Sequence, residues 1–93
     1  MKKPSWTKED DIVAFYLYRF GDKELLYSVE EISGILGMSA TSLKMRVANF
    51  KALNTGRGLD HYAKLSRQVY NEYKRYSEGN LRKIVIGIIS IKI

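Results

Sequence analysis

Apolar residues recur at helical spacing near the start of the chain: Ile12, Val13, Tyr16 and Phe20. Thr7 precedes them as a candidate N-cap, and the acidic residues 9–11 place negative charge where the first backbone N–H groups of a helix lack partners. Gly21 is a typical helix end. The pattern predicts a first helix between Thr7 and Gly21, with Trp6 folded back onto it as part of the core.

A second helix is predicted over residues 29–36. Ser28 and Glu31 have the spacing of a capping box, in which the serine hydroxyl and the glutamate carboxylate each accept a hydrogen bond from the other residue's backbone N–H. The buried face is marked by four apolar residues: Val29, Ile32, Ile35 and Leu36. Gly37 should end this helix, because glycine adopts the left-handed conformation of a helix end at little cost.

A third helix follows after a link of about three residues. Ser39 is its candidate N-cap, and its buried stripe has apolar residues at i, i+4 and i+7: Leu43, Val47 and Phe50. So short a link forces the two helices to cross steeply, as in a helix-turn-helix. Ser33, a small residue four positions before Gly37, suits the place where the third helix crosses the second.

A fourth helix is predicted from Asp60 to about Ser77, after a loop at residues 54–58. One arc of this helix carries large apolar side chains: Tyr62, Leu65, Val69, Tyr73 and Tyr76. The opposite arc is cationic: Lys64, Arg67, Lys74 and Arg75. One face should therefore pack against the domain, and the other should stay in solvent.

The last segment, residues 81–93, is rich in β-branched residues, which favours an extended strand over a helix. The remaining chain offers this strand no partner, and no two-residue turn would make it a hairpin. We therefore predict an all-α helix-turn-helix bundle of about four helices over residues 1–80, followed by an apolar, extended segment over residues 81–93. Residues 84–93 are a candidate element for homodimer formation, because an unpaired strand can pair with a copy of itself.

The 93 residues suffice for one small domain. The absence of cysteine excludes disulfides and thiolate metal sites, and it fits a reducing compartment. The first dozen residues do not resemble a signal peptide, and the longest apolar run is shorter than the about 20 residues that span a bilayer. These features predict a soluble, cytoplasmic protein with no membrane partner.

The net charge of +6 is unevenly distributed along the chain. Residues 1–43 hold five Lys or Arg against seven Asp or Glu, a formal charge of −2. Residues 44–93 hold eleven against three, a formal charge of +8. A protein that presents one face to phosphates has such a distribution, and so does a protein whose lysine-rich surface only keeps it in solution.

The third helix leaves a polar and cationic face beside its buried stripe. In a helix-turn-helix, this helix lies in the major groove of DNA with its first residues facing base edges. Because hydroxyls, an amide and cations suit base edges and phosphates, we predict seven contacts with DNA: Thr41, Ser42, Lys44, Met45, Arg46, Asn49 and Arg57. Three of them have alternative roles: Met45 as a filler between helices, Asn49 as a tie to the next loop and Arg57 as a solvated loop residue.

Residues 36–46, LGMSATSLKMR, resemble the helix-turn-helix of sigma-factor-like and response-regulator DNA-binding domains, in which the form L-G-x-S-x-x-T-V-K-x-R is frequent. The matching residues are Leu36, Gly37, Ser39, Leu43, Lys44 and Arg46. Ser42 stands where threonine is usual. The resemblance covers about twenty residues, and it implies that the third helix binds DNA.

A second resemblance covers more of the chain. Trp6-Thr7-x-Glu9-Asp10 is similar to the opening of Myb-like or SANT-type helical domains. Four further segments together resemble a small helical domain at the N terminus of some prokaryotic HNH-type endonucleases: Leu17-Tyr18, Leu36-Gly37-x-Ser39, Arg46-x-x-Asn49-Phe50-x-x-Leu53 and Gly58-Leu59. This resemblance implies a DNA-targeting module whose nuclease lies elsewhere, because the chain has one histidine, His61, and no Cys-x-x-Cys or paired-histidine signature.

No serine has a histidine and an acid at the spacing of a catalytic set, and Gly56-Arg57-Gly58 is too short to cradle a phosphate. We therefore expect no enzyme activity, cofactor, metal or small-molecule substrate. The predicted function is sequence-specific binding of double-stranded DNA, by a small transcription regulator or a DNA-targeting module. The alternative is a protein-interaction module that uses the same helices and the apolar C-terminal segment.

Overall fold

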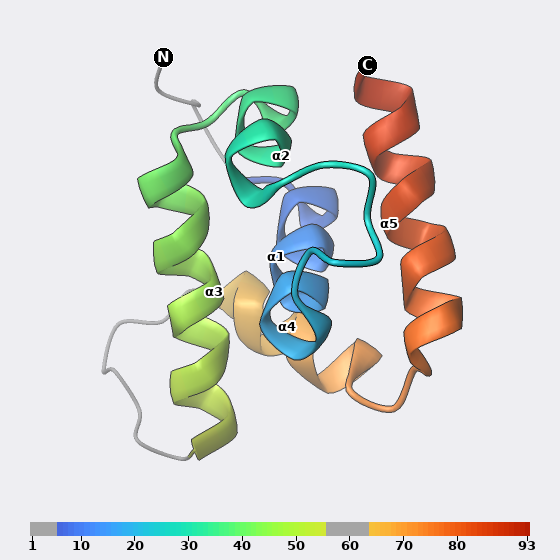
Figure 1. Ribbon diagram of the computed structural model, residues 1–93. Coiled ribbons are helices and arrows are strands. Elements are labelled where there is room, and N and C mark those ends of the chain that lie inside the picture. The colour runs from blue at the N-terminus through green and yellow to red at the C-terminus, as the bar shows by residue number, and fades with distance from the viewer. Residues whose placement is uncertain (1–5, 56–63) are drawn as a thin grey trace.

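The computed structural model describes residues 6–55 and 64–93, and these ranges form five helices and no strand. The helices are α1 (Lys8–Phe20), α2 (Val29–Leu36), α3 (Ala40–Thr55), α4 (Lys64–Tyr73) and α5 (Glu78–Lys92) (Figure 1). The all-α class is confirmed, with one helix more than the expected four. None of the described helices is long and apolar enough to cross a membrane.

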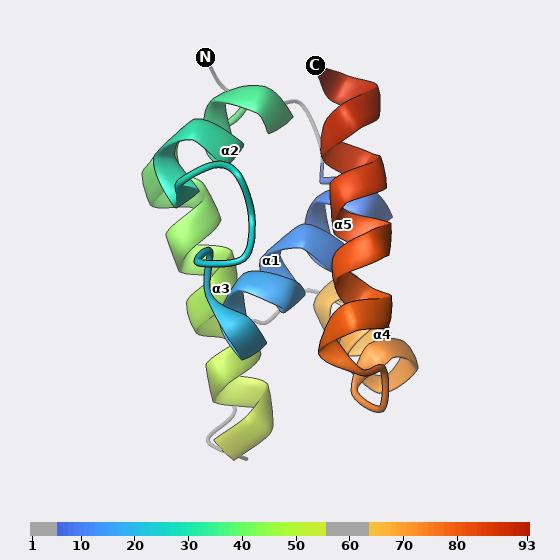
Figure 2. The same ribbon diagram turned by 45° about the vertical axis from the view of Figure 1, so that its right-hand side comes forward.

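Helix α1 is the centre of the bundle. It packs against α3, α4 and α5, while α2 bridges α3 and α5 (Figures 1 and 2). Six consecutive residues of α1, from Ile12 to Leu17, are buried, as expected of a helix that is covered on every side. The ring of Phe15 meets Phe50 of α3 edge to face, with 5.3 Å between the ring centroids.

The predicted ends of the first two helices and the predicted start of the third are confirmed. Thr7 and Asp10 form a capping box at α1, and Ser28 and Glu31 form the predicted one at α2. Gly37 has a φ of 82° and ends α2 in the left-handed conformation. The Ser39 side chain accepts a hydrogen bond of 3.1 Å from the Ser42 N–H at the start of α3.

The expected strand at the C terminus is wrong, because residues 78–92 form a helix. Ser77 caps it, with a hydrogen bond of 3.2 Å from the Asn80 N–H to the serine hydroxyl. Leu81, Val85 and Ile89 are four residues apart and lie buried on one face of α5. Burying each such side chain gains about 1.5–3 kcal/mol, which outweighs the cost of less than about 0.7 kcal/mol for a β-branched residue in a helix.

The predicted end of the fourth helix is also wrong. Helix α4 stops at Tyr73 rather than near Ser77, and Tyr76 is 38% exposed rather than packed. The Arg19 guanidinium of α1 donates hydrogen bonds to the carbonyl oxygens of Lys74 and Tyr76, at 2.7 and 3.4 Å, and so holds the turn that leads to α5. The predicted start at Asp60 and the side chain of Tyr62 lie outside the described residues.

Replacing Gly87 by alanine is expected to raise the free energy of unfolding by about 1 kcal/mol, because glycine inside a helix is less stable than alanine by that amount. A Cβ at this position meets no atom within 4 Å, so no clash opposes the gain. Urea unfolding followed by circular dichroism measures the change. A loss of stability would contradict a helical Gly87.

Candidate nucleic-acid interface

Helices α2 and α3 and the turn at Gly37 form the compact pair that the sequence predicts. The Met38 N–H donates to the Ser33 carbonyl oxygen at 2.9 Å, which closes the end of α2. Leu43 and Phe50 are fully buried on the inner face of α3, and Val47 is half-buried. The inner face fixes α3 on the core, so its outer face is set in one orientation.

The first two turns of α3 present four of the predicted contact residues to solvent: Thr41, Ser42, Lys44 and Met45. Met45 is 65% exposed, so it does not fill a gap between helices. Two further exposed positions, Ala48 and Lys51, continue this surface along the helix. We call the exposed face formed by Thr41, Ser42, Lys44 and Met45 the α3 face.

Lys44 forms an ion pair with Glu30 of α2. The ammonium nitrogen lies 3.0 Å from a carboxylate oxygen, and the two side chains are 60% and 62% exposed. The hydrogen bond from Lys44, together with its charge, lowers the pKa of the Glu30 carboxyl below its ordinary value of 4.5. An exposed pair of this kind stabilises a protein little, so Lys44 can exchange Glu30 for another anion.

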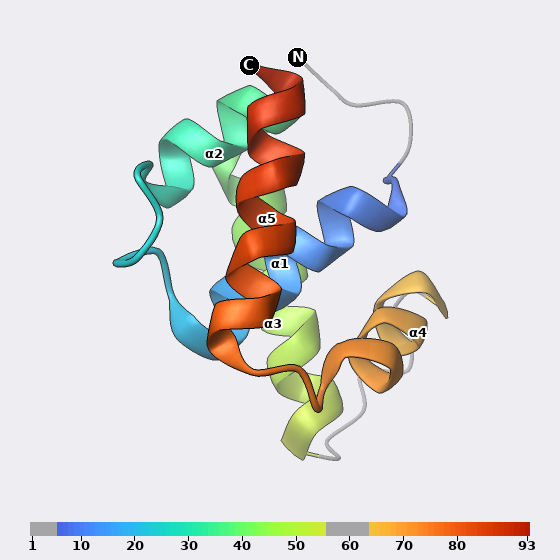
Figure 3. The same ribbon diagram turned by 90° about the vertical axis from the view of Figure 1, so that its right-hand side faces the viewer.

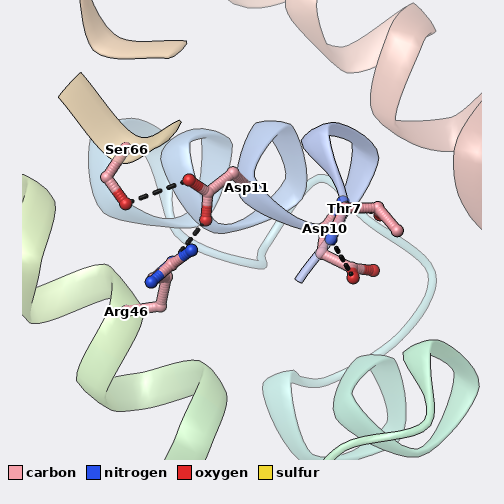
Figure 4. A network of polar contacts seen from close by, with 5 residues as sticks. All are labelled: Thr7, Asp10, Asp11, Arg46 and Ser66. Carbon is pink, nitrogen blue, oxygen red and sulfur yellow. Dashed lines mark hydrogen bonds and ion pairs between the residues drawn. The ribbon is translucent and has the colours of Figure 1, made fainter. Parts of the chain in front are cut away.

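Arg46 has a different role from its neighbours on α3. Its Nε lies 2.5 Å from Oδ1 of Asp11 on α1, and its side chain is only 13% exposed (Figure 4). The guanidinium carbon lies 4.4 Å from the centroid of the Trp6 ring. Arg46 therefore has a structural role, because its departure would leave the buried Asp11 carboxylate without a cation, and its contact with DNA stays a prediction.

Asp11 connects three helices through its two oxygens. Oδ1 pairs with Arg46 of α3, and Oδ2 accepts a hydrogen bond of 2.9 Å from the hydroxyl of Ser66 on α4 (Figure 4). Burial raises the pKa of the Asp11 carboxyl above its ordinary value of 3.8, although Arg46 and Ser66 oppose this effect. We call Asp11, Arg46 and Ser66 the polar clamp.

The polar clamp was not predicted from the sequence, in which Asp11 is one of three acidic residues that favour the start of a helix. One signal was present: Asp11, Phe15 and Tyr18 stand at i, i+4 and i+7, so the aspartate shares a face with core aromatic residues. An acid on a buried face requires a partner, and a basic residue elsewhere in the chain has to supply it.

Two predicted contacts remain, Asn49 and Arg57. Asn49 is half-buried on α3. Arg57 lies outside the described residues. The cationic arc predicted around the fourth helix is exposed at all four positions, although Lys74 and Arg75 follow the end of α4: Lys64, Arg67, Lys74 and Arg75.

The comparisons with known proteins add no relative. No protein-family model matches the chain, and no curated protein and no solved structure shows significant similarity to it. Within residues 6–55 and 64–93, no cluster of His, Cys, Asp or Glu side chains has an arrangement that could hold a metal ion.

Proposed function

We propose that the chain binds double-stranded DNA through the α3 face, as a small transcription regulator or a DNA-targeting module. One observation carries the proposal: the amino-terminal half of α3 follows a three-residue turn and exposes two hydroxyls, an ammonium group and a methionine. A helix presented in this way has the form that enters a major groove. The formal charge of +8 on residues 44–93 favours association with phosphates.

The side chains of the α3 face have two roles, which follow from their chemistry. Lys44 neutralises a backbone phosphate and contributes affinity through the release of counterions. Thr41 and Ser42 donate and accept hydrogen bonds at base edges, and Met45 makes an apolar contact such as one with a thymine methyl group. Sequence preference then comes from Thr41, Ser42 and Met45, whereas Lys44 strengthens binding to every duplex.

The polar clamp supports this function by fixing α3 to α1 and α4. Arg46 lies one turn after Ser42 and directly after Met45 on the same helix, and it donates a charged hydrogen bond to Asp11. A contact surface on a rigid element loses little conformational freedom when it binds. Arg46 thus serves DNA binding by positioning the helix that carries the contacts.

Replacing Lys44 by alanine is expected to weaken binding to a duplex of mixed sequence and to reduce the slope of log affinity against log salt by about one. Fluorescence anisotropy of labelled DNA over a salt series measures both quantities. Lys83→Ala is the matched control, because Lys83 is an exposed lysine on α5. The proposal fails if both variants bind like the parent chain, or if the chain binds no DNA at low salt, as the alternative of a protein-interaction module predicts.

Replacing Glu30 by glutamine is expected to strengthen binding to any duplex several-fold. The carboxylate of Glu30 competes with phosphate for Lys44 and repels the phosphate itself, and glutamine removes both effects. The same anisotropy assay measures the change, with Glu24→Gln as a control because Glu24 is an exposed acid in the loop before α2. Equal gains from both variants would assign the effect to net charge and not to the ion pair.

A further inference from the structure

An apolar surface lies on α5 and the loop between α1 and α2. Leu26, Ile86 and Ile93 are 90%, 43% and 72% exposed, and they line one hollow together with Tyr27 and Ser90. Figure 3 looks onto α5, with the loop beside it. A second hollow is lined by Tyr27, Ile93, Glu31 and Ile35, and it is adjacent to the first because the two share Tyr27 and Ile93. We call the surface formed by Leu26, Tyr27, Ile35, Ile86 and Ile93 the α5 patch.

The α5 patch places large apolar side chains beside one another in solvent. Leu26 and Ile93 are mostly exposed, and Ile86 is partly exposed. The centre of a protein interface is apolar, and its rim is polar. Adjacent apolar side chains at the surface of a small protein are a feature of interaction sites.

The charges around the α5 patch are opposite on its two sides. Residues 22–31, on the loop and α2, contain Asp22, Lys23, Glu24 and Glu31, a formal charge of −2 without Glu30, which pairs with Lys44 of α3. Residues 78–92 of α5 contain Arg82, Lys83, Lys92 and Glu78, a formal charge of +2. Glu24 and Glu31 are exposed on the acidic side, and Lys83 and Lys92 are exposed on the basic side.

We propose that the α5 patch binds a second copy of this chain in a two-fold symmetric dimer. In such an interface, whatever contact the first copy makes to the second is repeated from the second to the first. A two-fold axis that lies in the interface plane, along the border between the acidic and the basic side, sets the acidic side of each copy against the basic side of the other. A surface with both signs of charge and an apolar centre is therefore complementary to itself.

The proposed dimer leaves the α3 face uncovered. Helices α3 and α5 lie on opposite sides of α1, as the views in Figures 1 and 3 agree. Dimer formation is therefore compatible with binding through α3 and does not depend on it. The element predicted for dimer formation, residues 84–93, takes part as the surface of a helix together with Leu26 and Tyr27, and not as a paired strand.

Sedimentation velocity without DNA tests the proposal over a concentration series up to about 100 µM, since interfaces of standard size have dissociation constants in the micromolar range or below. The parent chain should dimerise, and the double variant Leu26→Ser, Ile93→Ser should be a monomer at every concentration. Ile91→Ser is the matched control, because Ile91 is 87% exposed on the same helix but does not line the hollow. Circular dichroism establishes that each variant is folded.

A mixing experiment tests the two-fold charge arrangement. Glu24→Lys and Lys83→Glu should each weaken the homodimer several-fold, while an equimolar mixture of the two should form a heterodimer more stable than either homodimer. A parent chain that stays monomeric would overturn the proposal and assign the patch to a different protein. A dimer that tolerates Leu26→Ser, Ile93→Ser, or that Ile91→Ser abolishes, would also overturn it.

Discussion

Replacing Arg46 by alanine should lower the free energy of unfolding by about 3–5 kcal/mol, because it leaves the buried Asp11 carboxylate without its cation. A small domain has a total stability of only about 5–15 kcal/mol. This variant should therefore be close to unfolded at room temperature, or it should unfold at a much lower urea concentration than the parent chain. Urea unfolding followed by circular dichroism measures the loss. A loss below about 1 kcal/mol, typical of a surface cation, would contradict the polar clamp.

Adding Asp11→Asn to Arg46→Ala should recover part of this stability, since the amide removes the buried charge and still bonds to Ser66. The pH dependence gives an independent check. Burial raises the pKa of Asp11 in the folded chain above 3.8, so the folded chain holds more protons than the unfolded chain between 3.8 and that raised value. The contribution of Asp11 to stability therefore falls as the pH rises through this window.

Without Arg46, the pKa of Asp11 should rise further, because the guanidinium that lowers it is gone. The pH range in which the contribution of Asp11 to stability falls then extends to higher pH. The loss in free energy of unfolding caused by Arg46→Ala should be largest near pH 7 and smaller near pH 4, where a larger fraction of Asp11 is protonated. If the loss in free energy of unfolding is the same at pH 7 and pH 4, its cause is the lost packing of Arg46 on Trp6 and not the unpaired charge of Asp11.

Ending the chain at Asn80 should abolish cooperative folding. The deletion removes Leu81, Val85 and Ile89, which are buried against the rest of the core, and uncovers α1. Burial of these three side chains alone supplies about 5–9 kcal/mol, which is comparable to the whole stability of a small domain. Heat unfolding followed by circular dichroism should show low helicity and no sharp transition.

Ending the chain at Ser90 is the matched control for this deletion. It removes three exposed residues, Ile91, Lys92 and Ile93, and keeps the three buried ones, so the free energy of unfolding should stay within about 1 kcal/mol of the parent value. A chain of residues 1–80 that folds cooperatively would contradict the account. It would mean that α5 is a dispensable appendage, as the sequence pattern alone suggests for residues 81–93.

The features predicted correctly from the sequence depend on neighbours in the chain. Ser28, Glu31 and Gly37 determine the bounds of α2 through bonds within four residues, and Ser39 acts in the same local way at α3. The exposure of Thr41 and Met45 follows from the helical period once Leu43 is recognised as buried. These signals are present in short segments and need no knowledge of the fold.

The features that were missed depend on distant residues. β-branched side chains weigh against a helix at residues 81–93, but packing on α1, about seventy residues earlier in the chain, decides the outcome. The ion pair of Arg46 was not predicted, because its partner Asp11 is 35 residues away in sequence. The Glu30–Lys44 pair likewise exists only because α2 and α3 cross at a fixed angle.

The most direct test of the account is an NMR titration of the ¹⁵N-labelled chain with a short duplex of mixed sequence at low salt. We predict that the largest changes in amide chemical shift occur at residues 39–45, at the start of α3, and that they disappear as salt is added. Residues 84–93 on α5 should change little. Changes confined to α5, or no change at residues 39–45 when DNA is in excess, would contradict DNA binding through α3.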